Sequence, residues 1–108
     1  MTEQHLPTPV AASLEATNAG DREGFLASFT ADGAVDDWGR VFVGRERIGG
    51  WSDAEFIGKK VTLAVNSVSV ADDEVTVVAT VGGNGFNGPS TFVYTVAGDQ
   101  IARMTIRE

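Results

Sequence analysis

The stretch that decides the fold is Ala31–Phe56, which reads ADGAVDDWGRVFVGRERIGGWSDAEF. It contains a short apolar strand that ends in two adjacent acids, Asp36 and Asp37, and a tight turn that begins at Trp38. Neighbouring side chains on a strand point to opposite faces, so Asp37 is expected to face inward and Asp36 outward. The stretch therefore predicts a carboxylate that lies beside aromatic side chains at the end of a strand.

Three helices are expected, and the main run of strands follows them. The first helix begins at one of two early prolines and closes at Gly20, because proline suits a first turn and glycine suits a left-handed residue after a helix. Asp21 is expected to cap a short second helix through its side chain. The third helix is expected from about Arg45 to Phe56, after a short strand at Val41–Val43.

After the third helix, four segments alternate apolar and polar residues with the period of a strand. A change of phase at Asn66 predicts a β-bulge, and the glycine-rich segment Gly82–Gly88 is expected to be a hairpin loop rather than a phosphate-binding loop. Short turns between consecutive strands require antiparallel pairing, and helices grouped before a strand meander indicate an α+β domain. The predicted strands are Val61–Val70, Val75–Val81, Pro89–Val96 and Ile101–Arg107.

Length and composition fit one small globular domain. The 108 residues are expected to form a single domain, 1–108, with residues 1–6 as a loose N-terminus. A net charge of −7 argues against nucleic acid and anionic membranes as partners, since both require clustered Lys and Arg. The chain has no cysteine, which excludes disulfides and thiolate metal sites, and we expect no metal or other cofactor. No segment resembles a signal peptide or a membrane span, so a cytoplasmic protein is expected.

Several segments carry a resemblance to a known superfamily. They are Asn18–Asp21, Phe29–Asp37 (FTADGAVDD), Phe42–Ile48 and Trp51, together with the strand order that follows. With them the chain resembles the NTF2-like superfamily, in its SnoaL-like and ketosteroid-isomerase-like branch, over about residues 8–107. The resemblance implies a cone-shaped α+β fold, with three N-terminal helices packed on the concave face of a strongly curved antiparallel sheet. It also implies a pocket at the wide end of the cone, and dimers that form through the outer face of the sheet.

The resemblance also implies a catalytic candidate. Ketosteroid isomerases combine an aspartate base with a tyrosine and a protonated aspartic acid that together stabilise an oxyanion. Asp37 matches the base, whereas the tyrosine position falls at Ser13 and the protonated acid falls near Thr91. Neither residue is an equivalent donor, and loss of one such donor costs about 10²–10³ in rate, so steroid isomerisation itself is not expected.

Aromatic residues around Asp37 are expected to form an apolar pocket for a small apolar or amphipathic ligand. Two functions remain open: an isomerase, cyclase or lyase that uses Asp37 as a general base, and a non-catalytic ligand-binding or dimeric interaction module. Apolar residues on both faces of the sheet favour a homodimer through its outer face. The candidate pocket residues, each of which can instead be plain core packing, are Trp38, Phe42, Trp51, Phe56, Phe25, Tyr94 and Met104.

Overall fold

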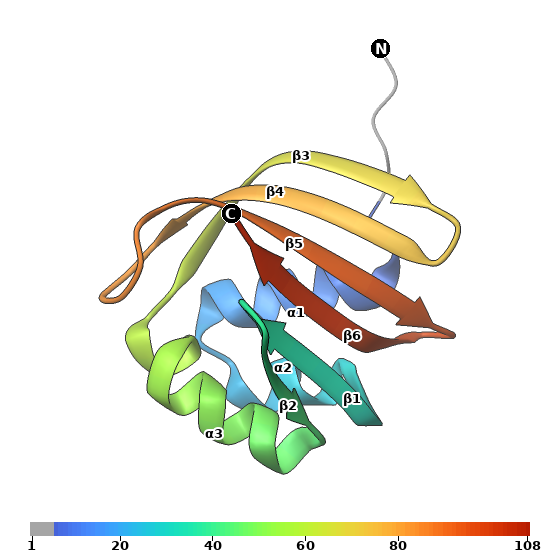
Figure 1. Ribbon diagram of the computed structural model, residues 1–108, viewed down its shortest axis with the longest axis horizontal. Helices are drawn as coiled ribbons and strands as arrows, with labels where there is room; N and C mark the ends of the chain where they lie inside the picture. The colour runs from blue at the N-terminus through green and yellow to red at the C-terminus, as the bar shows by residue number, and fades with distance from the viewer. Residues whose placement is uncertain (1–5) are drawn as a thin grey trace.

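The computed structural model describes residues 6–108, which form helices packed against a curved sheet of six strands (Figure 1). The helical segments are α1 (Thr8–Ala19), α2 (Arg22–Ala27), α3 (Arg45–Glu55) and the short 3-10 helix η1 (Ile57–Lys59). The strands are β1 (Phe29–Asp37), β2 (Arg40–Val43), β3 (Thr62–Ala71), β4 (Glu74–Gly82), β5 (Gly88–Ala97) and β6 (Gln100–Arg107). The predicted α+β class is confirmed.

The helix ends follow from local side-chain chemistry. Gly20 ends α1 in the left-handed conformation, with φ 70°, and its N–H donates to the carbonyl oxygen of Thr17 at 3.2 Å. The Asp21 side chain accepts a hydrogen bond from the N–H of Gly24 at 3.0 Å and so caps α2. Both caps were predicted from the sequence, and together they fix the sharp turn between the first two helices.

The sheet is mixed rather than wholly antiparallel. Its strand order is β2-β1-β6-β5-β4-β3, and β1 pairs with β6 in parallel, whereas the other four pairings are antiparallel. The prediction of an antiparallel sheet is therefore wrong for one pair of strands. Short turns dictate antiparallel pairing only between consecutive strands, and β6 reaches β1 after the chain has passed through α3 and the whole meander. The predicted bulge is confirmed by a register shift between Val65 and Ser67.

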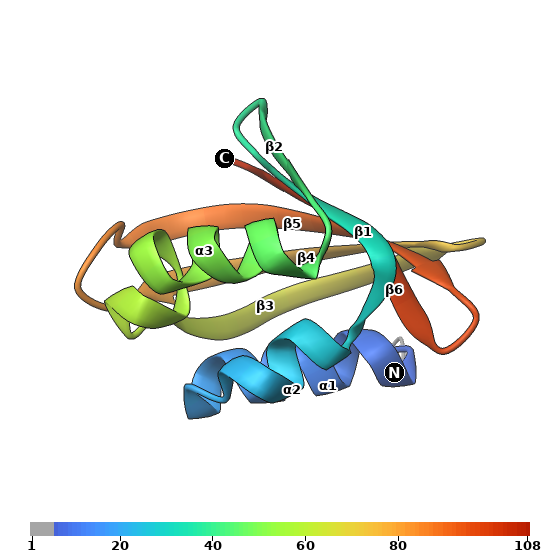
Figure 2. The same cartoon turned by 90° about the horizontal axis from the view of Figure 1, so that it is seen from below.

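One core lies between the helices and the inner face of the sheet (Figure 2). The helices contribute residues such as Val10 and Phe25, and the inner sheet face contributes Val35, Phe92 and Met104, all nearly or fully buried. No helix of the described region covers the outer face. Its side chains are mostly half-buried or exposed threonines and valines, among them Thr76, Val78, Thr91, Val93 and Thr95.

The N-terminal prediction lies almost wholly outside the described residues. Of the expected loose segment 1–6, only Leu6 is described, and its side chain is half-buried against the core. Among residues 6–108, no helix is long and apolar enough to cross a membrane.

Candidate functional site

A pocket of about 590 Å³ opens at the end of the sheet where β1, β4 and β6 finish and β5 begins. Pockets of this volume are typical of small-molecule sites. Its walls also include α3, η1 and the β4–β5 loop, residues 83–87. The lining residues are Asp37, Trp38, Trp51, Glu55, Phe56, Lys59, Val61, Val81, Gly82, Gly85, Phe86, Pro89, Ser90, Phe92, Ile106 and Glu108.

Asp37 contributes a fixed carboxylate to the wall of this pocket. Its Oδ2 accepts a hydrogen bond from Trp51 Nε1 at 3.0 Å and another from the guanidinium of Arg40. Its Oδ1 accepts no hydrogen bond from any residue of the described region. Because the Asp37 side chain is only 16% exposed, this second oxygen is an acceptor held at the edge of an apolar surface.

Arg40 ties Asp37 to α3. Its two Nη atoms also donate to the Glu55 carboxylate at 2.9 and 2.7 Å, so one guanidinium holds two acids of the pocket wall. The pKa of Glu55 is lowered, mainly by the hydrogen bond from Arg40, and the pKa of Arg40 is raised, first by Glu55 and then by Asp37. Arg40 and Glu55 are both substantially exposed, so their pair orients the wall more than it stabilises the fold.

Asp36 faces away from the pocket, as predicted, and its side chain stabilises the turn between β1 and β2. It accepts hydrogen bonds from Arg103 at 3.0 Å, from Arg107 at 3.1 Å and from the N–H of Gly39 at 2.7 Å. The hydrogen bond from Arg107, helped by those from Gly39 and Arg103, lowers the pKa of Asp36 to about 2 against the opposing effect of burial. Arg40, across the turn, pairs with Asp37 and not with Asp36, because its side chain lies on the face of Asp37.

The turn after β1 holds an aromatic residue in an unfavourable backbone conformation. Trp38 and Gly39 have φ values of 55° and 92°, as expected for a two-residue hairpin turn with positive φ at both positions. A bulky residue is rarely found there, since the left-handed region costs roughly 1–2 kcal/mol outside glycine. Trp38 is nevertheless 58% exposed at the pocket, and Phe86 in the β4–β5 loop is 63% exposed. Two large apolar side chains from separate elements are thus solvent-exposed at the same pocket.

Stacked aromatic rings form the inner wall. Trp51 stacks on Phe56, with ring centroids 4.8 Å apart and an angle of 23° between their planes. Phe56 in turn lies 6.5 Å from Phe92, which comes from β5. All three side chains are at most 5% exposed, so the inner part of the pocket is apolar and firmly packed.

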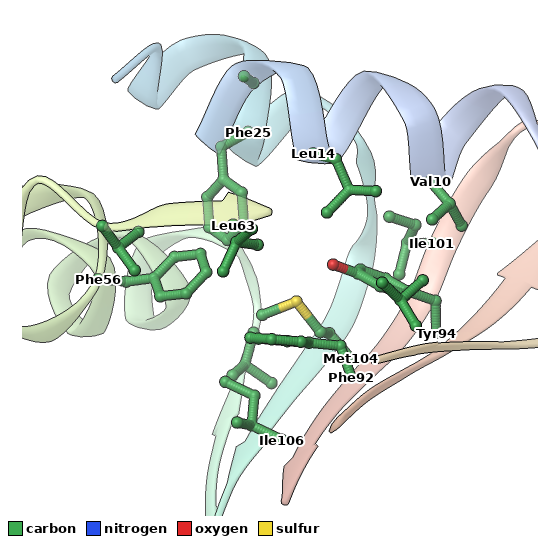
Figure 3. Close-up of a cluster of buried hydrophobic side chains, with 14 of the residues drawn as sticks. Val10, Leu14, Phe25, Phe56, Leu63, Phe92, Tyr94, Ile101, Met104 and Ile106 are labelled. Carbon is green, nitrogen blue, oxygen red and sulfur yellow. The ribbon is translucent and has the colours of Figure 1, made fainter. Parts of the chain in front are cut away.

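The remaining predicted lining residues do not reach this pocket. Phe42 is half-buried beside Trp51, with ring centroids 6.1 Å apart. Phe25, Tyr94 and Met104 lie in the core cluster between the helices and the inner face of the sheet (Figure 3). The structure thus brings together Asp37, Trp38, Trp51 and Phe56 of the predicted set. The other four residues support the pocket from behind or to one side.

Two hydroxyl groups are buried in the core between the helices and the sheet. The Tyr94 hydroxyl points into the core cluster on the side of Leu14 (Figure 3), and its burial raises its pKa. The Ser13 hydroxyl, on α1, has no hydrogen-bond partner among residues 6–108. Thr91, the other position implied by the resemblance, donates to the carbonyl of Glu108 on the outer face. Neither Ser13 nor Thr91 lines the pocket, so neither supplies an oxyanion donor there.

Sequence reasoning missed several pocket residues that a closer use of periodicity finds. Phe92 alternates in phase with Tyr94, and Glu55 follows Trp51 by one helical turn, so both share a face with a predicted residue. Phe86 is the single large apolar side chain of the glycine-rich loop. Lys59 gave no signal in the sequence. Within residues 6–108, no group of three or more His, Asp or Glu side chains is arranged to hold a metal ion.

The fold and the pocket define a class: a small α+β protein with a curved sheet, of the NTF2-like type. The model of the SnoaL-like domain matches residues 10–104, so the chain belongs to the SnoaL-like family. No curated protein matches the chain in sequence.

Solved structures give the same class. A proposed polyketide cyclase from Sinorhizobium meliloti is 27% identical, with a TM-score of 0.85 over 94% of this chain and 95% of that one. A protein of ketosteroid-isomerase-like fold from Catenulispora acidiphila, in complex with trimethylamine, is 26% identical, with a TM-score of 0.82 over 96% and 87%. A Mycobacterium tuberculosis protein in complex with estradiol-17beta-hemisuccinate is 21% identical, with a TM-score of 0.78 over 94% and 93%, and shows the shared fold alone.

Proposed function

We propose that this protein binds a small, largely apolar molecule in the pocket beside α3 and that Asp37 is the polar anchor. One observation carries the proposal. An apolar wall of Trp51, Phe56 and Phe92 adjoins a carboxylate whose Oδ2 is fixed by two donors and whose Oδ1 is left without a hydrogen bond from the described residues. Such a site combines apolar affinity with one directional polar contact, which is the usual composition of a small-molecule pocket.

Catalysis is the second candidate. Oδ1 of Asp37 is an available acceptor at an apolar surface, and a carboxylate so placed is a general base for an isomerase, cyclase or lyase reaction. The likeness to the proposed polyketide cyclase of Sinorhizobium meliloti supports this reading. Against it, the lining of the pocket contains no Tyr to stabilise an oxyanion, and Oδ2 of Asp37 is already held by Arg40 and Trp51. Binding is therefore the better-supported function, and proton abstraction would be a further step at the same oxygen.

A homodimer through the outer face of the sheet completes the proposal. Threonines and valines of β4 and β5 lie on that face beside Arg103, Thr105 and Arg107 of β6, and no described helix covers it. A second copy of the chain is the simplest cover for such a sheet. The pocket opens elsewhere, so binding and pairing use separate surfaces.

Ligand-induced thermal stabilisation tests the binding proposal, because a ligand that binds the folded state raises the melting temperature by mass action. We expect 2-naphthol to stabilise the wild type and to lose most of this effect in a double variant with Trp38→Ala and Phe86→Ala. Both side chains are mostly exposed, so the variant should fold. Val65→Ala removes another exposed apolar side chain, which is 43% exposed and lies outside the pocket, and serves as the control. Equal stabilisation of the double variant and the wild type would refute binding in this pocket.

A further inference from the structure

We infer that the ligand of this pocket carries a cationic amine, which sits between Oδ1 of Asp37 and the exposed aromatic rings. The inference rests on the proposed function and names the chemical class of its ligand. Three features of the site support an amine: the balance of charge around the pocket, the number of aromatic residues that line it, and the hydrogen bonds of Asp37.

Carboxylates outnumber cations around the pocket. Asp37, Glu55 and Glu108 line it, against Lys59 as the single lining cation among the described residues. Arg40 lies outside the lining and directs its guanidinium at the carboxylates of Asp37 and Glu55. The whole chain carries a net charge of −7, which adds a long-range field that attracts cations and repels anions.

The lining is unusually rich in aromatic rings. Five of them line the pocket, and the faces of such rings attract cations through their quadrupole. Trp38 and Phe86 are the two that stand more than half in water, and Trp38 does so from a strained turn position. Packing within the protein does not account for these two side chains, whereas an amine held between rings and a carboxylate does. The five rings are Trp38, Trp51, Phe56, Phe86 and Phe92.

The hydrogen bonds of Asp37 favour a donor on the ligand. Oδ2 is held by Trp51 and Arg40, so the carboxylate cannot turn freely and Oδ1 keeps one orientation. An oxygen that only accepts is complemented by an N–H or O–H of the ligand. A charged N–H forms the stronger bond, since charge-assisted hydrogen bonds are about twice as strong as neutral ones. The same carboxylate repels a ligand that carries an acid.

Three probes with one ring and different end groups test the ligand class. Phenethylamine, 2-phenylethanol and 3-phenylpropionate are cationic, neutral and anionic at neutral pH, and their affinities are measured by calorimetric titration at low salt. We expect the amine to bind about tenfold more tightly than the alcohol, and the propionate to bind most weakly. Asp37→Asn should remove most of the preference for the amine. Asp99→Asn, in the exposed turn before β6 and outside the pocket, changes the net charge equally and should keep the preference.

The outcomes separate this inference from the function on which it rests. If the alcohol binds the wild type as tightly as the amine, the amine class is wrong and small-molecule binding stands. If none of the three probes binds at millimolar concentration, both proposals are refuted. Added salt gives a test that needs no variant: the preference of the wild type for the amine should shrink as the ionic strength rises, and a preference independent of salt would contradict the charge argument.

Discussion

Replacing Asp36 with Asn should destabilise the protein at neutral pH and leave it almost unchanged near pH 2. The pKa of Asp36 is lowered from 3.8 to about 2, which corresponds to roughly 2 kcal/mol of folding free energy at neutral pH. Arg103 and Arg107 are 43% and 44% exposed, so water weakens both pairs and we expect a loss of about 1–2 kcal/mol.

The pH dependence follows from the direction of this pKa shift. A carboxylate with a lowered pKa in the folded state stabilises the fold above its unfolded pKa, and this contribution is lost as the pH falls through the folded value. Below that value the wild-type carboxyl is protonated and resembles the amide of the variant. The two proteins should therefore converge near pH 2.

Urea unfolding followed by tryptophan fluorescence at several pH values measures this difference in free energy. Asp99→Asn, in the exposed turn before β6, is the control for a simple change of net charge. A free-energy difference between wild type and Asp36→Asn that stays constant from neutral pH to pH 2, or that is absent at neutral pH, would refute the reasoning.

Three further substitutions, the first with a control at Ser52, test the core and the loop. Ser13→Ala should leave the free energy of unfolding in urea unchanged or raise it by up to about 1 kcal/mol, because the Ser13 hydroxyl is buried without a partner among the described residues. The Ser52 hydroxyl accepts a hydrogen bond from the N–H of Ile57, so the control Ser52→Ala should lower that free energy by about the same amount. Tyr94→Phe keeps the buried ring and should lower the free energy of unfolding by less than about 1 kcal/mol; a larger loss would show that the hydroxyl has a hydrogen-bond partner. Gly83 has φ 127°, and a Cβ there would lie 2.7 Å from the Lys60 carbonyl oxygen. Gly83→Ala should therefore lower the melting temperature and weaken 2-naphthol binding. Unchanged binding would show that the conformation of the β4–β5 loop does not matter for the pocket.

Local patterns predicted the elements and the faces of the strands, because both depend on neighbouring residues. Alternation placed Asp37 inward and Asp36 outward, and it placed Phe92 and Tyr94 on one face. Alternation does not tell how far along a strand a residue lies from the pocket. Two residues correspond to nearly 7 Å, which is enough for Phe92 to line the pocket and for Tyr94 to lie in the core.

Long-range partners could not be predicted in the same way. The parallel pairing of β1 with β6 depends on how the whole meander returns, and no local turn encodes it. Arg40 has two acids within a few residues, so the sequence alone does not tell which of them it contacts. The position of Phe86 at the pocket likewise depends on the β4–β5 loop, where the N–H of Asn84 donates to the carbonyl of Lys59 at 2.8 Å.

The most direct test of the central claim uses the indole N–H signals of the two tryptophans in a ¹H–¹⁵N spectrum. Trp38 is exposed at the pocket, and the indole N–H of Trp51 donates to Asp37. On titration with phenethylamine, and separately with 2-naphthol, both signals should shift and saturate with one dissociation constant for each probe. If neither indole signal moves while amides of the outer sheet face, such as those of Thr76 and Val93, do, the pocket beside Asp37 is not the binding site.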